Sequence, residues 1–242
     1  MWKETINRNN MNIAPFLAKA FVELDKAMQG TLNGTKIASI SETISHYALA
    51  SAAASMLAAV LPGGGGVAAA LAQAGFVWAT YVKINKTIGL SMSEETSKFI
   101  GSAIVTNLIT SFGALLAAHA VAGVLSFIPV AGSALAAAGE AAIGYCFIYA
   151  AAYIYLKLVS RVVKPDGSVN VSNKDSTKKI IEEIMQREDM KGLFKEGSKQ
   201  FKEAKRNGEF DKARKAHNCP NCGTAYTQGD HFCTVCGHDL TK

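Results

Sequence analysis

Four cysteines near the C-terminus form two Cys-x-x-Cys pairs, the pattern in this chain with the most specific chemistry. Cys219 pairs with Cys222 and Cys233 with Cys236, ten residues separate the pairs, and a glycine follows each. Tetrahedral zinc takes four thiolates, and a turn of this spacing directs two sulfurs at one ion. The glycine lets the backbone close around the metal. We therefore predict a structural Zn²⁺ site with these four cysteines as ligands.

Other uses of these cysteines are weaker alternatives. Disulfides belong to oxidising compartments, and a redox pair would need a βαβ pattern that is missing here. His217, His231 and His238 are rival ligands by residue type, but two complete cysteine pairs leave no position for them. A closed four-ligand site has no room for water or substrate, so we expect docking rather than catalysis. Nucleic acid is disfavoured as the partner of this segment, because Lys242 is the only basic residue after Cys219.

The rest of the chain is organised by an uneven distribution of charge. Hydrophobic residues make up 49% of the 242, yet residues 51–82 carry no charge and residues 99–156 carry only Glu140. Abundant alanine and the absence of β-like alternation predict an all-α fold, with helices over 44–61, 67–89, 93–127 and 131–162. Helix breakers separate these helices and predict the tips of two hairpins: Pro62, Gly63, Gly64, Gly65 and Gly66 in the first, Pro129 and Gly132 in the second.

The cations lie on one side of both predicted hairpins. They precede the first, flank the loop between the two, or follow the second: Lys3, Arg8, Lys19, Lys26, Lys36, Lys83, Lys86, Lys98, Lys157, Arg161 and Lys164. This is the positive-inside pattern of uncharged tips that enter or cross a membrane from the cytoplasm. The alternative is a helical bundle in water whose glycines and prolines only make tight turns.

The third apolar segment is the one expected to insert unaided, at roughly −4 to −8 kcal/mol, and the other three are marginal. Glu140 in the fourth costs roughly 2.5 to 3.5 kcal/mol in lipid and needs a partner. If the second hairpin turns between Pro129 and Val130, His119 lies opposite Glu140. We predict that these two pair, and a proton or ion path is the functional alternative.

Four regions follow from the composition. Residues 1–43 form an amphipathic or polar segment with a helix over 13–28, 44–163 the apolar hairpins, 164–217 a charged helical arm or linker, and 218–242 the ribbon. In the arm we expect a helix from Thr177 after an Asp175–Ser176 cap. The arm continues rich in lysine, with phenylalanines that either sit on a solvated helix or face anionic lipid: Phe194, Phe201 and Phe210.

Two resemblances add to these patterns. Residues 218–240 are similar to the short bacterial zinc-ribbon family. Residues 46–158, with Leu61–Pro62–Gly63, Ile128–Pro129–Val130–Ala131–Gly132 and the run from Gly139 to Tyr145, resemble the bacterial GTPase-associated membrane proteins of unknown function, the YcjF-like group. That resemblance implies a membrane-associated helical module that acts with a GTPase. This chain has no GTPase motif, so such a partner would act in trans.

We therefore expect a non-enzymatic adaptor in the bacterial cytoplasmic (inner) membrane. No export signal opens the chain, so both termini are expected in the cytoplasm. The run Gly63 to Gly66 lacks the Gly-Lys-Ser/Thr of a phosphate loop, and no nucleophile sits in a known motif. Membrane lipid and a protein are the expected partners, and alanines four apart suggest homo-oligomers. A conditionally inserting pore-forming effector and a soluble helical scaffold are the alternatives.

The predicted pair of His119 and Glu140 can be tested by substitution. If the two side chains neutralise each other in the membrane, His119→Leu and Glu140→Gln should disturb membrane insertion alike, because each leaves the other group unpaired. Retention of each variant in the membrane pellet after alkaline carbonate extraction measures the effect. Loss of insertion in His119→Leu alone would count against the pair.

Overall fold

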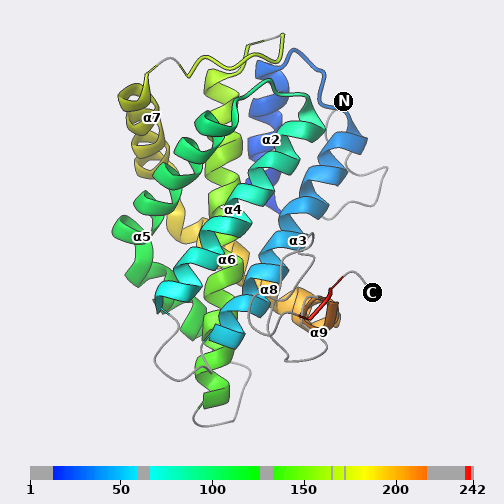
Figure 1. Ribbon diagram of the computed structural model, residues 1–242, viewed down its shortest axis with the longest axis vertical. Helices are drawn as coiled ribbons and strands as arrows, with labels where there is room; N and C mark the ends of the chain where they lie inside the picture. Colours follow the sequence, from blue (N-terminus) through cyan, green and yellow to red (C-terminus); the bar gives the residue numbers. More distant parts are fainter. Residues whose placement is uncertain are drawn as a thin grey trace.

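The computed structural model describes residues 13–58, 66–125, 133–164, 166–171, 173–216 and 238–240. In these ranges the chain forms eight helices and no β-strand, so the all-α prediction is confirmed there. The helices, drawn in Figure 1, are α2 (Pro15–Ala27), α3 (Gly34–Ala58), α4 (Gly66–Ile88), α5 (Glu94–Leu125), α6 (Ser133–Val162), α7 (Lys174–Arg187), α8 (Met190–Arg206) and α9 (Glu209–Ala216).

Several predicted features lie outside the described part. Within the helices, side chains are not described at 57–58, 66–72, 112, 114–125, 133–137 and 215–216. Of the predicted hairpin tips, only the backbone of Gly66 is described, as the first residue of α4. The other tip residues, the side chain of His119 and the four ribbon cysteines lie outside the described residues: Pro62, Gly63, Gly64, Gly65, Pro129, Gly132, Cys219, Cys222, Cys233 and Cys236.

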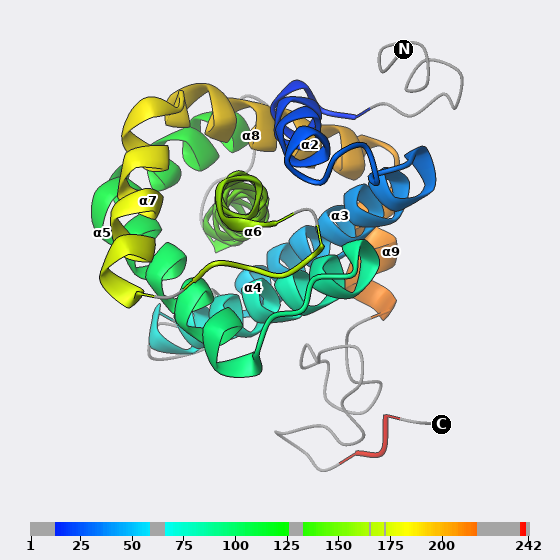
Figure 2. The same ribbon diagram turned by 90° about the horizontal axis from the view of Figure 1, so that it is seen from above.

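Helix α6 is the centre of the molecule. Seen from above, α2, α3, α4, α5, α7 and α8 surround it (Figure 2), and each of the six contacts it. The segment Ala138–Val162 is long and apolar enough to cross a membrane, and within the described residues it alone passes that test. Its most apolar window is 94% buried inside the protein, which is also the pattern of a core helix. The composition of this helix predicted exposure to lipid, but in the structure other helices cover it.

Helix α3 begins ten residues earlier than predicted from the sequence. Its first residue is Gly34, and the Asn33 side chain caps the helix by accepting a hydrogen bond from the Lys36 N–H at 2.9 Å. Ile37, Ile40 and Ile44 are all buried, at helical spacing. The prediction placed Ile37 and Ile40 in the N-terminal segment 1–43 and began the apolar helix at Ile44, but isoleucines at this spacing among polar residues are the pattern of an amphipathic helix that packs on a core.

Local caps and a glycine turn set the limits of several helices. Ser93 caps α5, since its Oγ accepts from the Thr96 N–H at 3.1 Å. The turn after α6 contains Gly167 at a φ of +79°, a left-handed conformation that suits glycine. Helix α7 begins at Lys174, earlier than Thr177, because Asn173 rather than Asp175 or Ser176 provides the cap.

Residues 174–216 do not form a solvated arm. Phe194, Phe201 and Phe210 are buried, at 1%, 4% and 4% exposed, and Phe201 packs against Tyr145 of α6 and Phe210 of α9. Both interpretations given to these phenylalanines, a solvated arm and an apolar face toward lipid, are therefore wrong for them. Amphipathic helices α7 and α8 instead pack on α6, and α9 packs on α3 and α8.

Helix α8 crosses α6 where one glycine permits a close approach. A Cβ on Gly197 would lie 3.3 Å from the Cys146 Sγ and 3.5 Å from its Cα. Cys146 is buried, as predicted for a core residue, and its Sγ lies 3.4 Å from the Ser198 Oγ. The crossing point is thus fixed near the middle of α6.

Polar contacts join α3, α4 and α6. The Ser51 hydroxyl donates to the Gln73 Oε1 at 2.6 Å and lies 3.0 Å from the Gly144 carbonyl oxygen, and the Gln73 amide donates to Ser55 at 2.7 Å. Further along α4 and α6, the rings of Tyr81 and Tyr155 stack at 3.9 Å. Hydrogen-bonded polar groups give a core of small residues a specific register.

We expect Gly144→Ala to destabilise the fold. The added Cβ would lie 2.8 Å from the Ser51 carbonyl oxygen, so α3 and α6 would have to separate, at a cost of about 1 to 3 kcal/mol. Gly75→Ala in α4 is the matched control, because its Cβ meets nothing within 4 Å and alanine favours helix by about 0.5 to 1 kcal/mol. Urea unfolding of both variants measures the effect, and equal stability of the two would contradict this packing.

Candidate functional site

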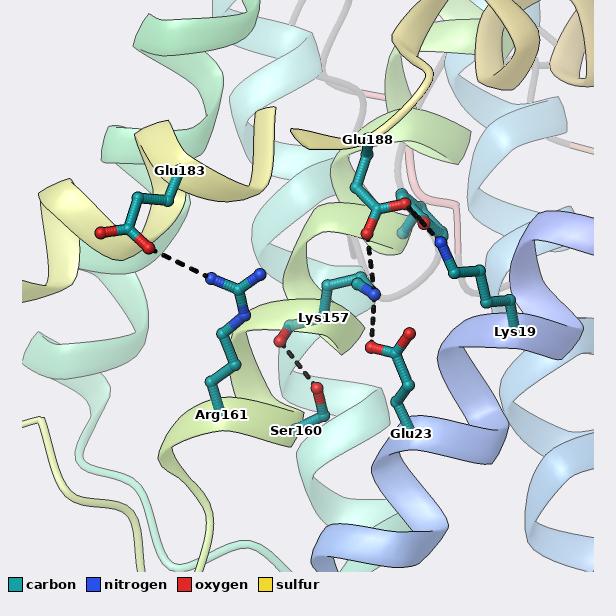
Figure 3. Close-up of polar contacts among 8 residues, drawn as sticks. Lys19, Glu23, Lys157, Ser160, Arg161, Glu183 and Glu188 are labelled. Carbon is teal, nitrogen blue, oxygen red and sulfur yellow. Dashed lines mark hydrogen bonds and ion pairs between the residues drawn. The ribbon is translucent and has the colours of Figure 1, made fainter. Parts of the chain in front are cut away.

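A lysine is buried in the last third of the central helix. The side chain of Lys157 is 4% exposed, on a helix face that packs against α2 and the connection between α7 and α8. A buried ammonium group must be paired to remain charged. Its Nζ contacts the Glu188 Oε1 at 2.8 Å and also Glu23 of α2 (Figure 3).

Glu188 is the centre of these contacts. It lies in the connection between α7 and α8, and its side chain is 8% exposed. Besides Lys157, it accepts from the Tyr153 hydroxyl at 2.5 Å and from the Lys19 Nζ at 2.9 Å. We call these five residues, Lys19, Glu23, Tyr153, Lys157 and Glu188, the ion cluster.

The backbone around Glu188 holds this side chain in place. Glu188 is the C-cap of α7, with its N–H bonded to the Ile184 carbonyl at 3.0 Å. The next residue, Asp189, is the N-cap of α8 and accepts from the Gly192 N–H at 2.9 Å. The sharp connection between two capped helices points the carboxylate toward α6.

The hydrogen bonds stabilise the carboxylate form of Glu188. Burial by itself raises the pKa of Glu188, but the three donors outweigh it and lower that pKa from the usual 4.5 to about 2. Glu188 therefore stays ionised at neutral pH and compensates the charge of Lys157. The ion cluster is a fully paired charge network rather than a group poised to transfer a proton.

A second contact attaches α8 to the same two helices. The Glu196 carboxylate accepts from the Phe16 backbone N–H at 3.1 Å, at the start of α2, and from the Tyr149 hydroxyl of α6. An acid at a helix N-terminus also stabilises the helix dipole. Glu188 and Glu196 together clamp α8 to α2 and α6.

Two cavities adjoin this clamp. One of about 430 Å³ lies between α5 and the α7–α8 connection and includes Asn107, Ser111 and Glu188 in its lining. The other, about 230 Å³, lies among α2, α3, α6 and α8, with Tyr149 and Gln200 in its wall. The contacts of Glu188 and Glu196 anchor α8 beside both cavities.

Sequence reasoning missed the ion cluster. Lys157 was grouped with the cations that follow the second hairpin, and Glu188 was not singled out. One signal in the sequence could have indicated it, because Lys157 follows directly on a long apolar stretch. A lysine that is buried with such a stretch needs a carboxylate partner to stay charged. Which carboxylates it would meet depends on helices far away in sequence.

The predicted partner positions in the second hairpin are only half described. Glu140 is exposed on α6, whereas the side chain of His119 lies outside the described residues. Their pairing stays a prediction.

The predicted metal centre is assessed from its donor set. Among the described residues no group of three or more His, Cys, Asp or Glu side chains could hold a metal ion. The four ribbon cysteines would supply four thiolates, which fits tetrahedral Zn²⁺ and leaves no position for a substrate. Zinc bound there would hold the ribbon together, because a segment this short has too little core to fold without it.

Comparison with known proteins identifies one domain. Residues 218–240 match the zinc-ribbon domain family, which agrees with the predicted ribbon and supports zinc binding. No curated protein matches the chain, and no solved structure does. The resemblance of residues 46–158 to the YcjF-like group has no support from these comparisons.

Removal of one member of the ion cluster should destabilise the protein strongly. Lys157→Ala removes the buried ammonium group, which leaves Glu23 without this partner and the buried Glu188 carboxylate with Lys19 as its remaining cation, and breaking a buried ion pair costs about 3 to 5 kcal/mol. Lys199→Ala on α8 is the control, because its pair with Glu203 is 4.0 Å long and exposed and is worth about 0.5 kcal/mol or less. The free energy of unfolding in urea distinguishes the two, and similar values would contradict the burial of Lys157.

Acid should remove the contribution of Glu188. Because its folded pKa is lowered, the stabilisation is present above about pH 4.5 and is lost as the pH falls toward 2. Glu188→Gln should therefore lose most relative to wild type at neutral pH, and the difference should shrink in acid. Glu182→Gln, at an exposed site on α7, is the control and should follow the wild-type profile. A constant difference for Glu188→Gln across the pH range would refute the lowered pKa.

Zinc content tests the ribbon directly. We expect one zinc per chain in the purified protein and its loss in Cys219→Ser or Cys233→Ser, since each substitution removes one of four thiolates. Cys146→Ala should keep the metal, because this cysteine is buried between α6 and α8. Elemental analysis gives the stoichiometry, and an unchanged zinc content in both serine variants would exclude the predicted ligand set.

Proposed function

We propose that this protein is a non-enzymatic adaptor at the cytoplasmic face of the bacterial inner membrane. The observation that carries the proposal is the separation of charge along the bundle. The end of α3 and start of α4 lie at the same end of the molecule as the end of α5 and start of α6 (Figure 1). Residues 51–82 have no charge and residues 99–156 only Glu140. We call the end of the molecule formed by the end of α3, the start of α4, the end of α5 and the start of α6 the charge-free end.

The proposed mode of contact is entry of the charge-free end into the lipid, not a crossing. Charged helices pack on α6 beyond Cys146, and the ion cluster surrounds Lys157. Carrying these helices through a hydrocarbon core would cost several kcal/mol for each charge. In the two glycine- and proline-containing segments and the adjoining helix ends, Glu140 is the one residue that carries such a penalty.

The zinc ribbon is the proposed docking element for a protein partner. It follows α9, and its predicted four-thiolate site would make it a small rigid knob without an open metal position. Few basic residues accompany it, so a protein is favoured over nucleic acid. A GTPase acting in trans is the candidate that the resemblance of residues 46–158 suggests. Self-association of the charge-free ends would add a second kind of protein contact.

One observation favours a second candidate, a soluble helical scaffold. The most apolar window of α6 is 94% buried by protein, so its composition is accounted for without lipid. In this case the charge-free end would be covered by another protein or by a second copy. The ribbon would keep the same docking role.

Membrane fractionation with matched variants tests the proposal. Membranes from cells that express the full chain are washed at high salt, which removes electrostatic binding only. We expect wild type to stay in the pellet. The variant Gly64→Glu/Val130→Glu adds one charge between α3 and α4 and one between α5 and α6, and it should move to the supernatant. Ser91→Glu/Gln186→Glu adds the same charge at exposed sites elsewhere and should stay bound. Added protease should not reach the ribbon while the spheroplasts are intact, and it should cleave the ribbon once they are lysed.

The outcomes separate the candidates. Wild type that appears in the supernatant as a compact species before any wash would reject the membrane adaptor and favour the scaffold. Membrane retention together with dye leakage from loaded liposomes would identify a pore-forming effector instead.

A further inference from the structure

Helix α8 carries its basic residues on one side. At about 100° per residue, its six cations fall within a sector of about 120°, and we call this sector the basic flank: Lys191, Lys195, Lys199, Lys202, Lys205 and Arg206. All but Lys202 are exposed. The helix contains only two acids, and the inward-directed Glu196 is already bonded to Phe16 and Tyr149. Glu203, paired with Lys199 at 4.0 Å, lies at the edge of the flank.

The contacts of α8 indicate which way the basic flank points. Helix α2 runs parallel to α6, because Phe16 packs on Tyr153 and the later Glu23 meets Lys157. It therefore lies on the side of α8 away from the charge-free end. Glu196 and Gly192, about a third of a turn from the centre of the basic flank, face α2. The basic flank is consequently the edge of α8 nearer the charge-free end.

The distance from α8 to the charge-free end matches the depth of one lipid leaflet. From Ser133 to the crossing with α8 at Cys146, α6 rises about 20 Å at about 1.5 Å per residue. Half of a bilayer, headgroups included, is about 20 to 22 Å thick. If the charge-free end enters one leaflet, α8 lies at the level of the headgroups. Glu140, exposed about 9 Å below α8, would then lie close to the headgroup boundary.

We propose that the basic flank of α8 binds the headgroups of anionic phospholipids. The proposal rests on the proposed function, since it assumes that the charge-free end meets lipid, and it adds the lipid class. Lysines near an anionic surface attract it additively, whereas a neutral surface gives them nothing. The flank faces the lipid while the apolar face of α8 stays packed on α6, so binding requires no rearrangement of the bundle.

Vesicle flotation of the full-length protein tests this assignment. Vesicles of phosphatidylcholine alone are compared with vesicles that also contain phosphatidylglycerol. We expect Lys195→Gln/Lys199→Gln/Lys205→Gln to lower partitioning onto the anionic vesicles by roughly one to two orders of magnitude and to leave partitioning onto neutral vesicles unchanged. Lys178→Gln/Lys179→Gln/Arg187→Gln on α7 removes the same charge from exposed sites and should bind like wild type. Circular dichroism establishes that both variants keep their helices.

The outcomes distinguish the lipid assignment from the membrane adaptor on which it rests. Wild type that binds both vesicle types equally, with no effect of the α8 substitutions, would overturn the role of the basic flank and keep the membrane adaptor. Equal losses in the α7 and α8 variants would overturn it too, because net charge alone would then explain binding. Wild type that binds duplex DNA through these lysines, and no vesicle, would overturn both the lipid assignment and the membrane adaptor.

Discussion

A helix that is apolar on every side has to be enclosed on every side, and α6 is such a helix. Its residues from Ala141 to Val159 are apolar or aromatic apart from Lys157, and the surrounding helices remove nearly all of them from water. This constraint explains why α7 to α9 pack against the bundle instead of extending into solvent. It also explains the amphipathic character of α2, α7 and α8, which need one apolar face toward α6 and one polar face outward.

Lys157 modifies that enclosure at one point. Its ammonium group is kept charged by carboxylates from α2 and from the connection between α7 and α8, so three elements distant in sequence must meet at one position. An apolar core tolerates small shifts of one helix along another, whereas a buried ion pair loses its compensation when the partners move apart. The ion cluster therefore defines where α2 and α8 sit along α6, and Gly197 allows α8 to come close enough.

The position of α8 links the packing to the proposed membrane contact. Because Glu196 faces α2, the basic residues of α8, about a third of a turn away, lie along the edge nearer the part of the bundle that carries almost no charge. An uncharged end with cations around its base is a suitable shape for shallow entry into an anionic leaflet.

The sequence by itself indicated the helices up to α7, most of their limits and a zinc-ribbon domain at residues 218–240, because helical periodicity, capping and ligand spacing are local properties. It misplaced the start of α3 and left α7 to α9 as an arm, since their amphipathic faces indicate a partner without identifying it. The tertiary structure alone decided that α6 is covered by protein in its upper part and that Lys157 meets Glu188. Lipid and a protein core are both low-dielectric surroundings, so composition favours either equally, and the pairing of charges far apart in sequence follows from the packing of the helices.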